Sequence, residues 1–187
     1  MFILTSILLG IALAMDAFSV SIVNGLNEPN MNNYKKIVIP FVFAIFQFIM
    51  PLVVYICVYN LAENFKVFAD IAPFIGFGLL LIIGLKMIIE GILKKDDDKI
   101  ITSFPILLLQ GLATSIDALS VGFAIDSYSM LEAVISCIVI GVITFGICIT
   151  GVIIGKKIGK KLNGISSIIG GAILIVIGII ILVKALI

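Results

Sequence analysis

Six long apolar stretches dominate this sequence and restrict it to a membrane fold. Of its 187 residues, 62% are hydrophobic and only 12% are charged, whereas a soluble domain is roughly a quarter charged. About 20 mostly apolar residues cross a bilayer, and each crossing segment must satisfy its own backbone as a helix. We therefore predict one all-α transmembrane domain over residues 1–187, without a soluble or nucleotide-binding domain. The six predicted transmembrane helices cover about residues 3–24, 37–59, 71–93, 104–125, 132–155 and 165–186.

The lysines predict an orientation for these helices. All 12 basic residues are lysine, and nine of them fall in the first, third and fifth loops, which lie on one side of the membrane. The opposite side holds only Lys66 and Lys184. The positive-inside rule then predicts that the lysine-rich loops are cytoplasmic and that both termini lie outside. The nine are Lys35, Lys36, Lys94, Lys95, Lys99, Lys156, Lys157, Lys160 and Lys161.

Two aspartates lie inside apolar stretches in matching contexts. Asp16 in the first stretch and Asp117 in the fourth are each followed by Ala-x-Ser-Val. An ionisable side chain at the centre of a membrane helix costs about 2.5–3.5 kcal/mol on insertion scales. Because the chain carries this cost twice, we expect both carboxylates to have a function.

The aspartate motifs belong to a longer internal repeat. They are 101 residues apart, and the glycine pattern of 75–84 recurs 94 residues later in 169–178, although chance similarity among apolar segments is an alternative for both matches. The first three stretches would thus match the last three, giving repeats of about 1–95 and 100–187. Since each repeat crosses three times, the second must be inverted, and substrate sites in such folds lie near the midplane between repeats.

The residue types around the aspartates predict a site for a hard cation. Two carboxylates in a dry cavity repel each other, and a divalent cation between them removes this repulsion. Oxygen ligands suit Mn²⁺ and Mg²⁺, and the chain has no histidine. Ser19 and Ser120 follow the aspartates by three residues, so they would add oxygens to the site or, alternatively, allow close helix contact.

Three further polar positions are candidates with two interpretations each. Gln47 lies four residues before Pro51 and would be an additional ligand or make an interhelical hydrogen bond. Thr144 has a comparable position in the fifth stretch, but we expect its hydroxyl to bond to its own helix. Glu90 would be a cytoplasmic ligand with Lys86 as counter-ion, or the two would form a snorkelling pair.

Two other patterns are interpreted as packing. Isolated cysteines without metal-type spacing in apolar helices act as small apolar residues. A GxxxGxxxG series allows two helices to approach closely. These residues are Cys57, Cys137, Cys148 and the series Gly151, Gly155 and Gly159.

Four segments together resemble the MntP family of manganese efflux pumps, in the LysE transporter superfamily. They are 12–21, Gln47 with 50–51, 84–91 and 113–122. The resemblance extends over the whole chain. It implies export of Mn²⁺ as a substrate, without a cofactor, across the inner or plasma membrane of a bacterium through the intramembrane acidic residues. Mn²⁺ and the bilayer are then the partners, and a homo-oligomer is left open.

The two aspartates in apolar stretches also help to distinguish a transporter from other classes of membrane protein. An exporter without an ATPase domain needs another energy source, and we hypothesise that protons compete with the cation for Asp16 and Asp117. The alternatives are an exporter of another LysE-type substrate, such as a basic amino acid, and an intramembrane aspartyl protease. Intramembrane aspartyl proteases typically carry a Gly-x-Gly-Asp motif, and this sequence does not contain one. A non-transporting assembly protein would not need buried carboxylates, so we expect a transporter and not an enzyme.

Overall fold

Every described element of this protein is an α-helix, in agreement with the predicted class. The computed structural model describes residues 2–61, 65–93, 103–125, 128–159 and 166–186. The helices are α1 (Phe2–Asn27), α2 (Asn33–Leu61), α3 (Phe65–Leu93), α4 (Phe104–Thr114), α5 (Ala118–Ala124), α6 (Met130–Gly159) and α7 (Ser166–Leu186). Five of the six predicted stretches correspond to single helices, whose bounds differ from the prediction by a few residues.

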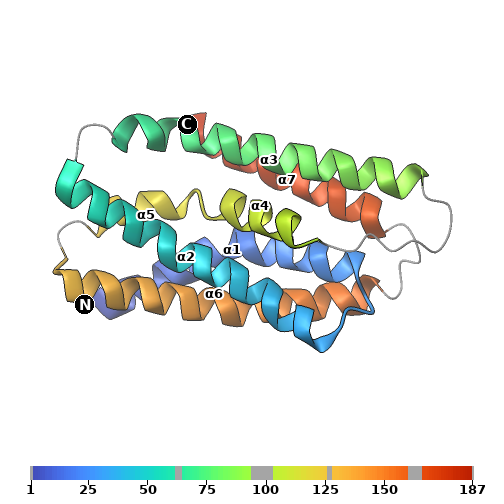
Figure 1. The fold of residues 1–187 in the computed structure, drawn as a ribbon, viewed down its shortest axis with the longest axis horizontal. Coiled ribbons are helices and arrows are strands. Elements are labelled where there is room, and N and C mark those ends of the chain that lie inside the picture. Colours follow the sequence, from blue (N-terminus) through green and yellow to red (C-terminus); the bar gives the residue numbers. More distant parts are fainter. Residues whose placement is uncertain (1, 62–64, 94–102, 126–127, 160–165, 187) are drawn as a thin grey trace.

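The helices form an elongated bundle and run along its long axis (Figure 1). The C-terminal ends of α1, α3 and α6 lie at one end of the bundle, and both chain termini lie toward the other end (Figure 1). The described lysines of the first and fifth loop regions cap the end that holds the C-termini of α1 and α6. We call this the lysine end; it carries Lys35, Lys36, Lys156 and Lys157.

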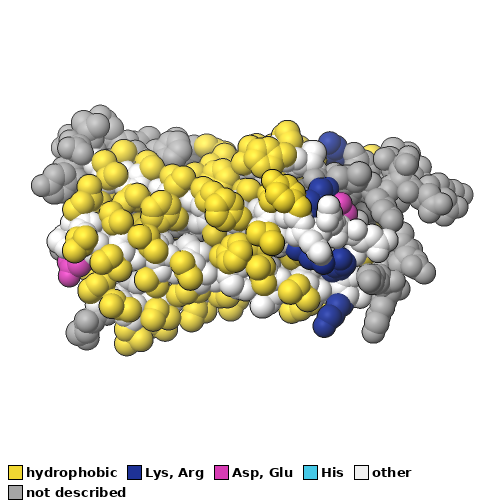
Figure 2. Space-filling view, turned by 60° about the horizontal axis from the view of Figure 1, so that its bottom comes forward, with side chains coloured by type: hydrophobic (Ala, Val, Ile, Leu, Met, Phe, Trp, Pro, Cys, Tyr) yellow, Lys and Arg dark blue, Asp and Glu magenta, His cyan; other side chains and the backbone are white. Residues whose placement is uncertain are grey.

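The outside of the bundle is apolar over its middle, as a lipid-facing surface requires. Figure 2 shows hydrophobic side chains covering this region, with lysines gathered at one end. Leu131, Val142 and Ile82 are each about two-thirds exposed or more, at 71%, 66% and 66%. Among the described residues, α1, residues 33–57 of α2, and α6 are long and apolar enough to cross a membrane. Shorter apolar stretches lie in α3, α4 and α7.

The predicted continuous helix over 104–125 is wrong, because the chain leaves the helical conformation at Ser115, Ile116 and Asp117. The break lies inside the bundle, where Ser115 is fully buried. Tight turns replace the helical ladder, since the amides of Ala118 and Leu119 donate to the carbonyls three residues back. Non-helical backbone at membrane depth is tolerated where protein surrounds it in this way.

A local difference between the two aspartate motifs explains why only the second is broken. Thr114 and Ser115 precede Asp117, and their hydroxyls donate to backbone carbonyls three or four residues back. Such bonds compete with the helical ladder. The matching residues of the first motif are Leu13 and Ala14, which are strong helix formers. Accordingly, α1 continues without interruption past its aspartate.

The predicted close packing at the glycine series of α6 is confirmed. A Cβ on Gly151, Gly155 or Gly159 would collide with the carbonyl oxygen of Phe18, Ile22 or Leu26 of α1. The partner numbers increase together along the chain, so α1 and α6 run parallel. A second close pair, α3 and α7, is antiparallel, and there Gly84 and Gly171 each lie against the other's carbonyl oxygen.

We predict that Gly155→Ala destabilises the protein, because the added methyl group meets the backbone of Ile22. Overpacking of this kind costs about 1–3 kcal/mol. Gly146→Ala in the same helix is the control, since nothing lies within 4 Å of its Cβ position. Unfolding of both variants by sodium dodecyl sulfate in mixed micelles measures the effect. Equal midpoints for the two variants would contradict the packing described for α1 and α6.

A candidate cation site at the broken helix

The side chain of Gln47 joins the two aspartate motifs. It lies in α2 and is almost fully buried, at 1% exposed. Its amide nitrogen Nε2 donates to the carbonyl oxygens of Leu13 in α1 and Thr114 at the end of α4, each at 3.2 Å. A side-chain amide has two N–H groups, so each one can serve one carbonyl. The two backbone carbonyls are therefore held on either side of a single nitrogen atom.

The two carbonyls that Gln47 binds occupy the same place in each motif. Leu13 is three residues before Asp16, and Thr114 is three residues before Asp117. The first motif continues as a helix, while the second enters the break, where Asp117 is the last non-helical residue before α5. Gln47 thus brings equivalent points of two segments that are 101 residues apart in the chain to the same depth of the bundle.

The break at Asp117 creates backbone groups that need partners. Thr114 ends α4, and the amide of Ala118 bonds to Ser115 instead of to Thr114. The hydrogen bond from Gln47 supplies a donor to this carbonyl. An unsatisfied buried carbonyl costs about 1–3 kcal/mol. Gln47 therefore stabilises the non-helical conformation that carries Asp117.

The buried side-chain oxygens without a hydrogen bond among the described residues include two neutral ones close to this level. One is Oε1 of Gln47, and the other is Oγ1 of Thr144 in α6. The prediction that the Thr144 hydroxyl bonds to its own helix is therefore wrong. The interhelical hydrogen bond predicted for Gln47 is present, and its Oε1 is still available to a ligand. Amide and hydroxyl oxygens are ligands that hard cations accept.

The remaining predicted site residues are Ser19, Ser120 and Glu90. Ser19 is half-buried, and its hydroxyl donates to the carbonyl of Met15 in its own helix at 3.0 Å, which leaves its lone pairs for other contacts. Ser120 lies in α5 and Glu90 in α3, but both side chains fall outside the described residues. The described residues contain no group of three His, Cys, Asp or Glu side chains close enough to hold a metal ion.

A buried polar contact near the site was not predicted from the sequence. Asn24 of α1 donates from Nδ2 to Oε1 of Gln110 in α4 at 2.8 Å. Both side chains are almost completely buried. The signal in the sequence was available, since Asn24 and Gln110 are amides inside apolar stretches, as Gln47 is. Gln47 differs from these two amides in lying four residues before a proline, Pro51, and that spacing drew attention to it alone.

The apolar exterior, the lysine end and the buried break at an aspartate define a polytopic helical membrane protein of the transporter class. A family described as "Putative manganese efflux pump" matches residues 30–182. The chain therefore belongs to this family, whose members are transporters and not enzymes.

Individual relatives match over nearly their full length. A protein of Methanobrevibacter smithii named "Putative manganese efflux pump MntP" is 43% identical over 177 residues, covering 92% of each chain. A protein of the same name from Methanosphaera stadtmanae is 43% identical over 178 residues, covering 94% of this chain and 96% of the relative. One from Gloeothece citriformis is 38% identical over 190 residues, covering 98% and 96%. No solved structure matches.

We predict that Gln47→Leu destabilises the protein by about 1–3 kcal/mol, because the carbonyl of Thr114 loses its buried donor. Thr150→Val is the control, since Thr150 is exposed and its hydroxyl bonds only within α6. The midpoint of unfolding in mixed micelles checks the difference. If Gln47→Leu unfolds at the same detergent fraction as Thr150→Val, the amide does not support the break.

Proposed function

We propose that this protein exports Mn²⁺ from the cytoplasm and binds it between Asp16 and Asp117 during transport. The single observation that carries this proposal is the bridge from Gln47 to the same backbone position of both aspartate motifs. The names of the relatives, which describe manganese efflux pumps, supply the metal and the direction. The described residues supply a physical reason for a cation at this level of the bundle.

The proposed ligands are oxygens of both charged and neutral groups. The two aspartates balance the charge of a divalent ion, and Oε1 of Gln47 and Oγ1 of Thr144 are buried oxygens that lack a hydrogen bond among the described residues. Ser19, Ser120 and Glu90 remain proposed ligands or neighbours of the cation. Broken helices at the midplane bind ions in many transporters, because unwound backbone can turn toward the substrate. The break at Asp117 gives this chain such an element.

We further propose that the chain consists of two inverted repeats of three transmembrane helices each. Pairs of contacts support this, since each contact has a counterpart at the matching positions of the other repeat. The contact of Gly10 with Ile143 corresponds to that of Gly111 with Phe46. These pairs are related by an offset of 101 residues between α1 and α4, and by an offset of 97 residues between α2 and α6.

The correspondence holds on both sides of the break. Gly151 lies against Ser21 in the same way as Gly122 lies against Val54, which gives the same two offsets. In α3 and α7, the contact of Gly84 with Gly171 corresponds to that of Phe77 with Gly178, with an offset of 94. Unrelated apolar segments would not repeat their contacts in this order, so the correspondence argues against chance similarity.

A groove on the surface of α2 and α6 supports the same symmetry. Four of its residues come from α2, and the other four are their counterparts 97 residues later in α6. A pseudo-two-fold axis between the repeats would pass through this groove. The pairs are Phe41 with Ile138, Ala44 with Gly141, Ile45 with Val142, and Phe48 with Phe145.

We propose that the lysine end faces the cytoplasm and that both termini face outward. The described lysines near this end, including Lys35 and Lys156, support this orientation through the positive-inside rule. Lys156 also donates to the carbonyl of Met31 at 3.3 Å, which ties α6 to the first loop. The proposed location is the cytoplasmic membrane of the cell.

We predict that Asp16→Asn and Asp117→Asn each abolish Mn²⁺ efflux, because a single carboxylate cannot balance a divalent charge in a dry site. The measurement is growth of an efflux-deficient strain in excess Mn²⁺ together with the metal content of the cells, at matched membrane expression. Glu132→Gln is the control, since Glu132 caps the N-terminus of α6 through Ser129, and glutamine also suits this position. Near-normal efflux by either aspartate variant would contradict the proposed site.

We predict that efflux depends on a pH gradient, because two protons competing with Mn²⁺ for Asp16 and Asp117 would replace one Mn²⁺ at equal charge. The measurement is Mn²⁺ flux in proteoliposomes with an imposed pH gradient and the voltage clamped by potassium and valinomycin. Protons entering from outside should increase efflux. Flux that follows voltage but ignores the pH gradient would exclude proton exchange, while the metal site would stand.

A further inference from the structure

The amides Asn24 and Gln110, which we call the amide pair, lie between the aspartates and the lysine end. Asn24 follows Asp16 by eight residues in α1, about 12 Å along the helix axis toward the lysine end. Gln110 lies in α4 one turn before the helix ends at Thr114, on the same side of the break. α1, which carries Asp16, and α4, which ends just before the break at Asp117, thus meet through a hydrogen bond of 2.8 Å at this level.

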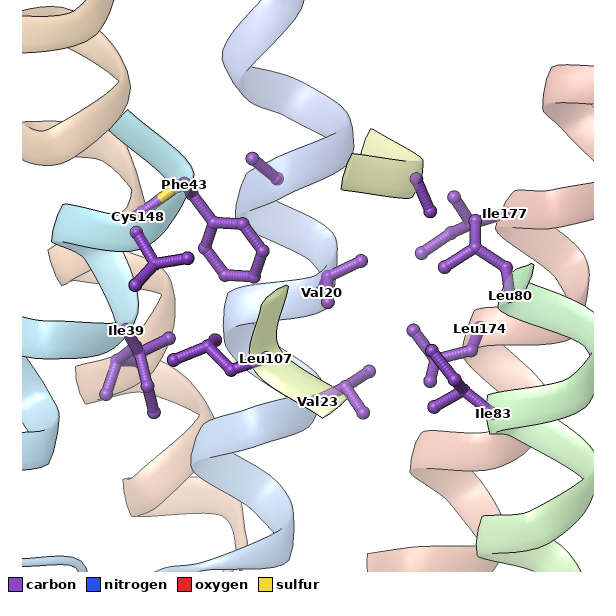
Figure 3. Packing of buried hydrophobic residues seen from close by; sticks show 14 of the residues in the cluster. Val20, Val23, Ile39, Phe43, Leu80, Ile83, Leu107, Cys148, Leu174 and Ile177 are labelled. Atoms are coloured by element: carbon purple, nitrogen blue, oxygen red, sulfur yellow. The ribbon is translucent and has the colours of Figure 1, made fainter. Parts of the chain in front are cut away.

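The surroundings of the amide pair are apolar and tightly packed. Val20, Val23 and Leu107, from the same two helices, belong to the largest buried cluster of the described residues. Figure 3 shows these three side chains among others of that cluster contributed by α2, α3, α6 and α7. Gly25, next to Asn24, packs directly against the backbone of α6 near Val152. A cation moving along the interface of α1 and α4 would therefore meet the two amides within a largely apolar cluster, with the buried Ser21 and Asn27 one turn away in α1.

The matching positions on the opposite side of the aspartates are apolar. With the offset of 101 residues, Asn24 corresponds to Ile125, and Gln110 corresponds to Leu9. Ile125 is buried in a second apolar cluster, and Leu9 packs against that cluster. We call these residues the apolar pair. The two proposed repeats thus differ at these two pairs of matching positions: each pair has an amide in one repeat and an apolar side chain in the other. The surrounding contacts nevertheless correspond.

We infer that the amide pair is a polar gate through which a partly dehydrated divalent cation reaches the aspartates from the lysine end, and that the apolar pair closes the opposite side. The inference rests on the proposed cation transport. When the hydrogen bond between the amides opens, both side chains can turn carbonyl oxygens to the cation and replace lost water. Hard cations bind neutral carbonyl oxygens and dissociate from them readily, and a cation that passes through a gate needs such weak binding.

Leucine at both amide positions tests this gate. Asn24→Leu with Gln110→Leu copies the chemistry of the apolar pair and should reduce Mn²⁺ transport in proteoliposomes at least tenfold. Binding of Mn²⁺ to the purified variant, measured by isothermal titration calorimetry, should remain within about threefold of wild type. Ser6→Ala with Ser136→Ala is the matched control, because these hydroxyls form a buried hydrogen bond of 2.8 Å between α1 and α6 in a segment that precedes the aspartate. This control should keep both binding and transport.

The outcomes separate the gate from the site. Transport within threefold of wild type in the folded leucine variant overturns the gate. Loss of Mn²⁺ binding in that variant also overturns it, because the amides would then belong to the site itself. Unchanged Mn²⁺ binding in Asp16→Asn would instead overturn the proposed function.

A second pair of variants decides the matter if the leucine variant does not fold. Asn24→Ser with Gln110→Ser keeps oxygens at the gate, whereas Asn24→Ala with Gln110→Ala is of similar size and has none. Faster Mn²⁺ transport by the serine variant supports the gate, and equal rates overturn it.

Discussion

The fold around the candidate site depends on one amide group, that of Gln47. Its nitrogen holds the carbonyls of Leu13 and Thr114, which come from segments far apart in the sequence. In the apolar interior of a membrane protein, a backbone carbonyl freed by a helix break needs such a donor. The amide thus links the broken segment to the first motif, at the backbone position three residues before each aspartate.

The break makes the two motifs unequal despite their similar sequences. Hydroxyls at Thr114 and Ser115 draw hydrogen bonds away from the helical ladder. The first motif keeps its helix, which remains fastened to α6 through the glycine contacts of Gly151 and Gly155. Asp16 therefore lies within a continuous helix, and Asp117 lies on a non-helical segment between two helices.

The asymmetry extends beyond the break to the chemistry on either side of it. The amides of Asn24 and Gln110 lie on the side of the aspartates toward the lysine end. The apolar side chains at the corresponding positions, Leu9 and Ile125, lie on the opposite side. The proposed inverted repeat alone would make the two directions across the membrane equivalent, so side chains that depart from it would give the molecule its polarity. The proposed direction of transport needs a difference of this kind.

Much of this architecture could be predicted from the sequence, because hydrophobicity and charge act locally. The apolar stretches, the close packing at Gly151, Gly155 and Gly159, and the interhelical bond of Gln47 were predicted and are present. The break at Asp117 was not predicted, and neither was a Thr144 hydroxyl without a hydrogen bond among the described residues. Each depends on which groups lie opposite in other helices. The same holds for the contact of Asn24 with Gln110. The sequence by itself determined a helical membrane protein with six apolar stretches and two aspartates inside them. The reason is that the burial of apolar residues and the cost of a charge in the membrane are properties of each segment. Only the tertiary structure decided where a helix stops and which amides meet, because those outcomes depend on hydrogen-bond partners that the chain brings together only on folding.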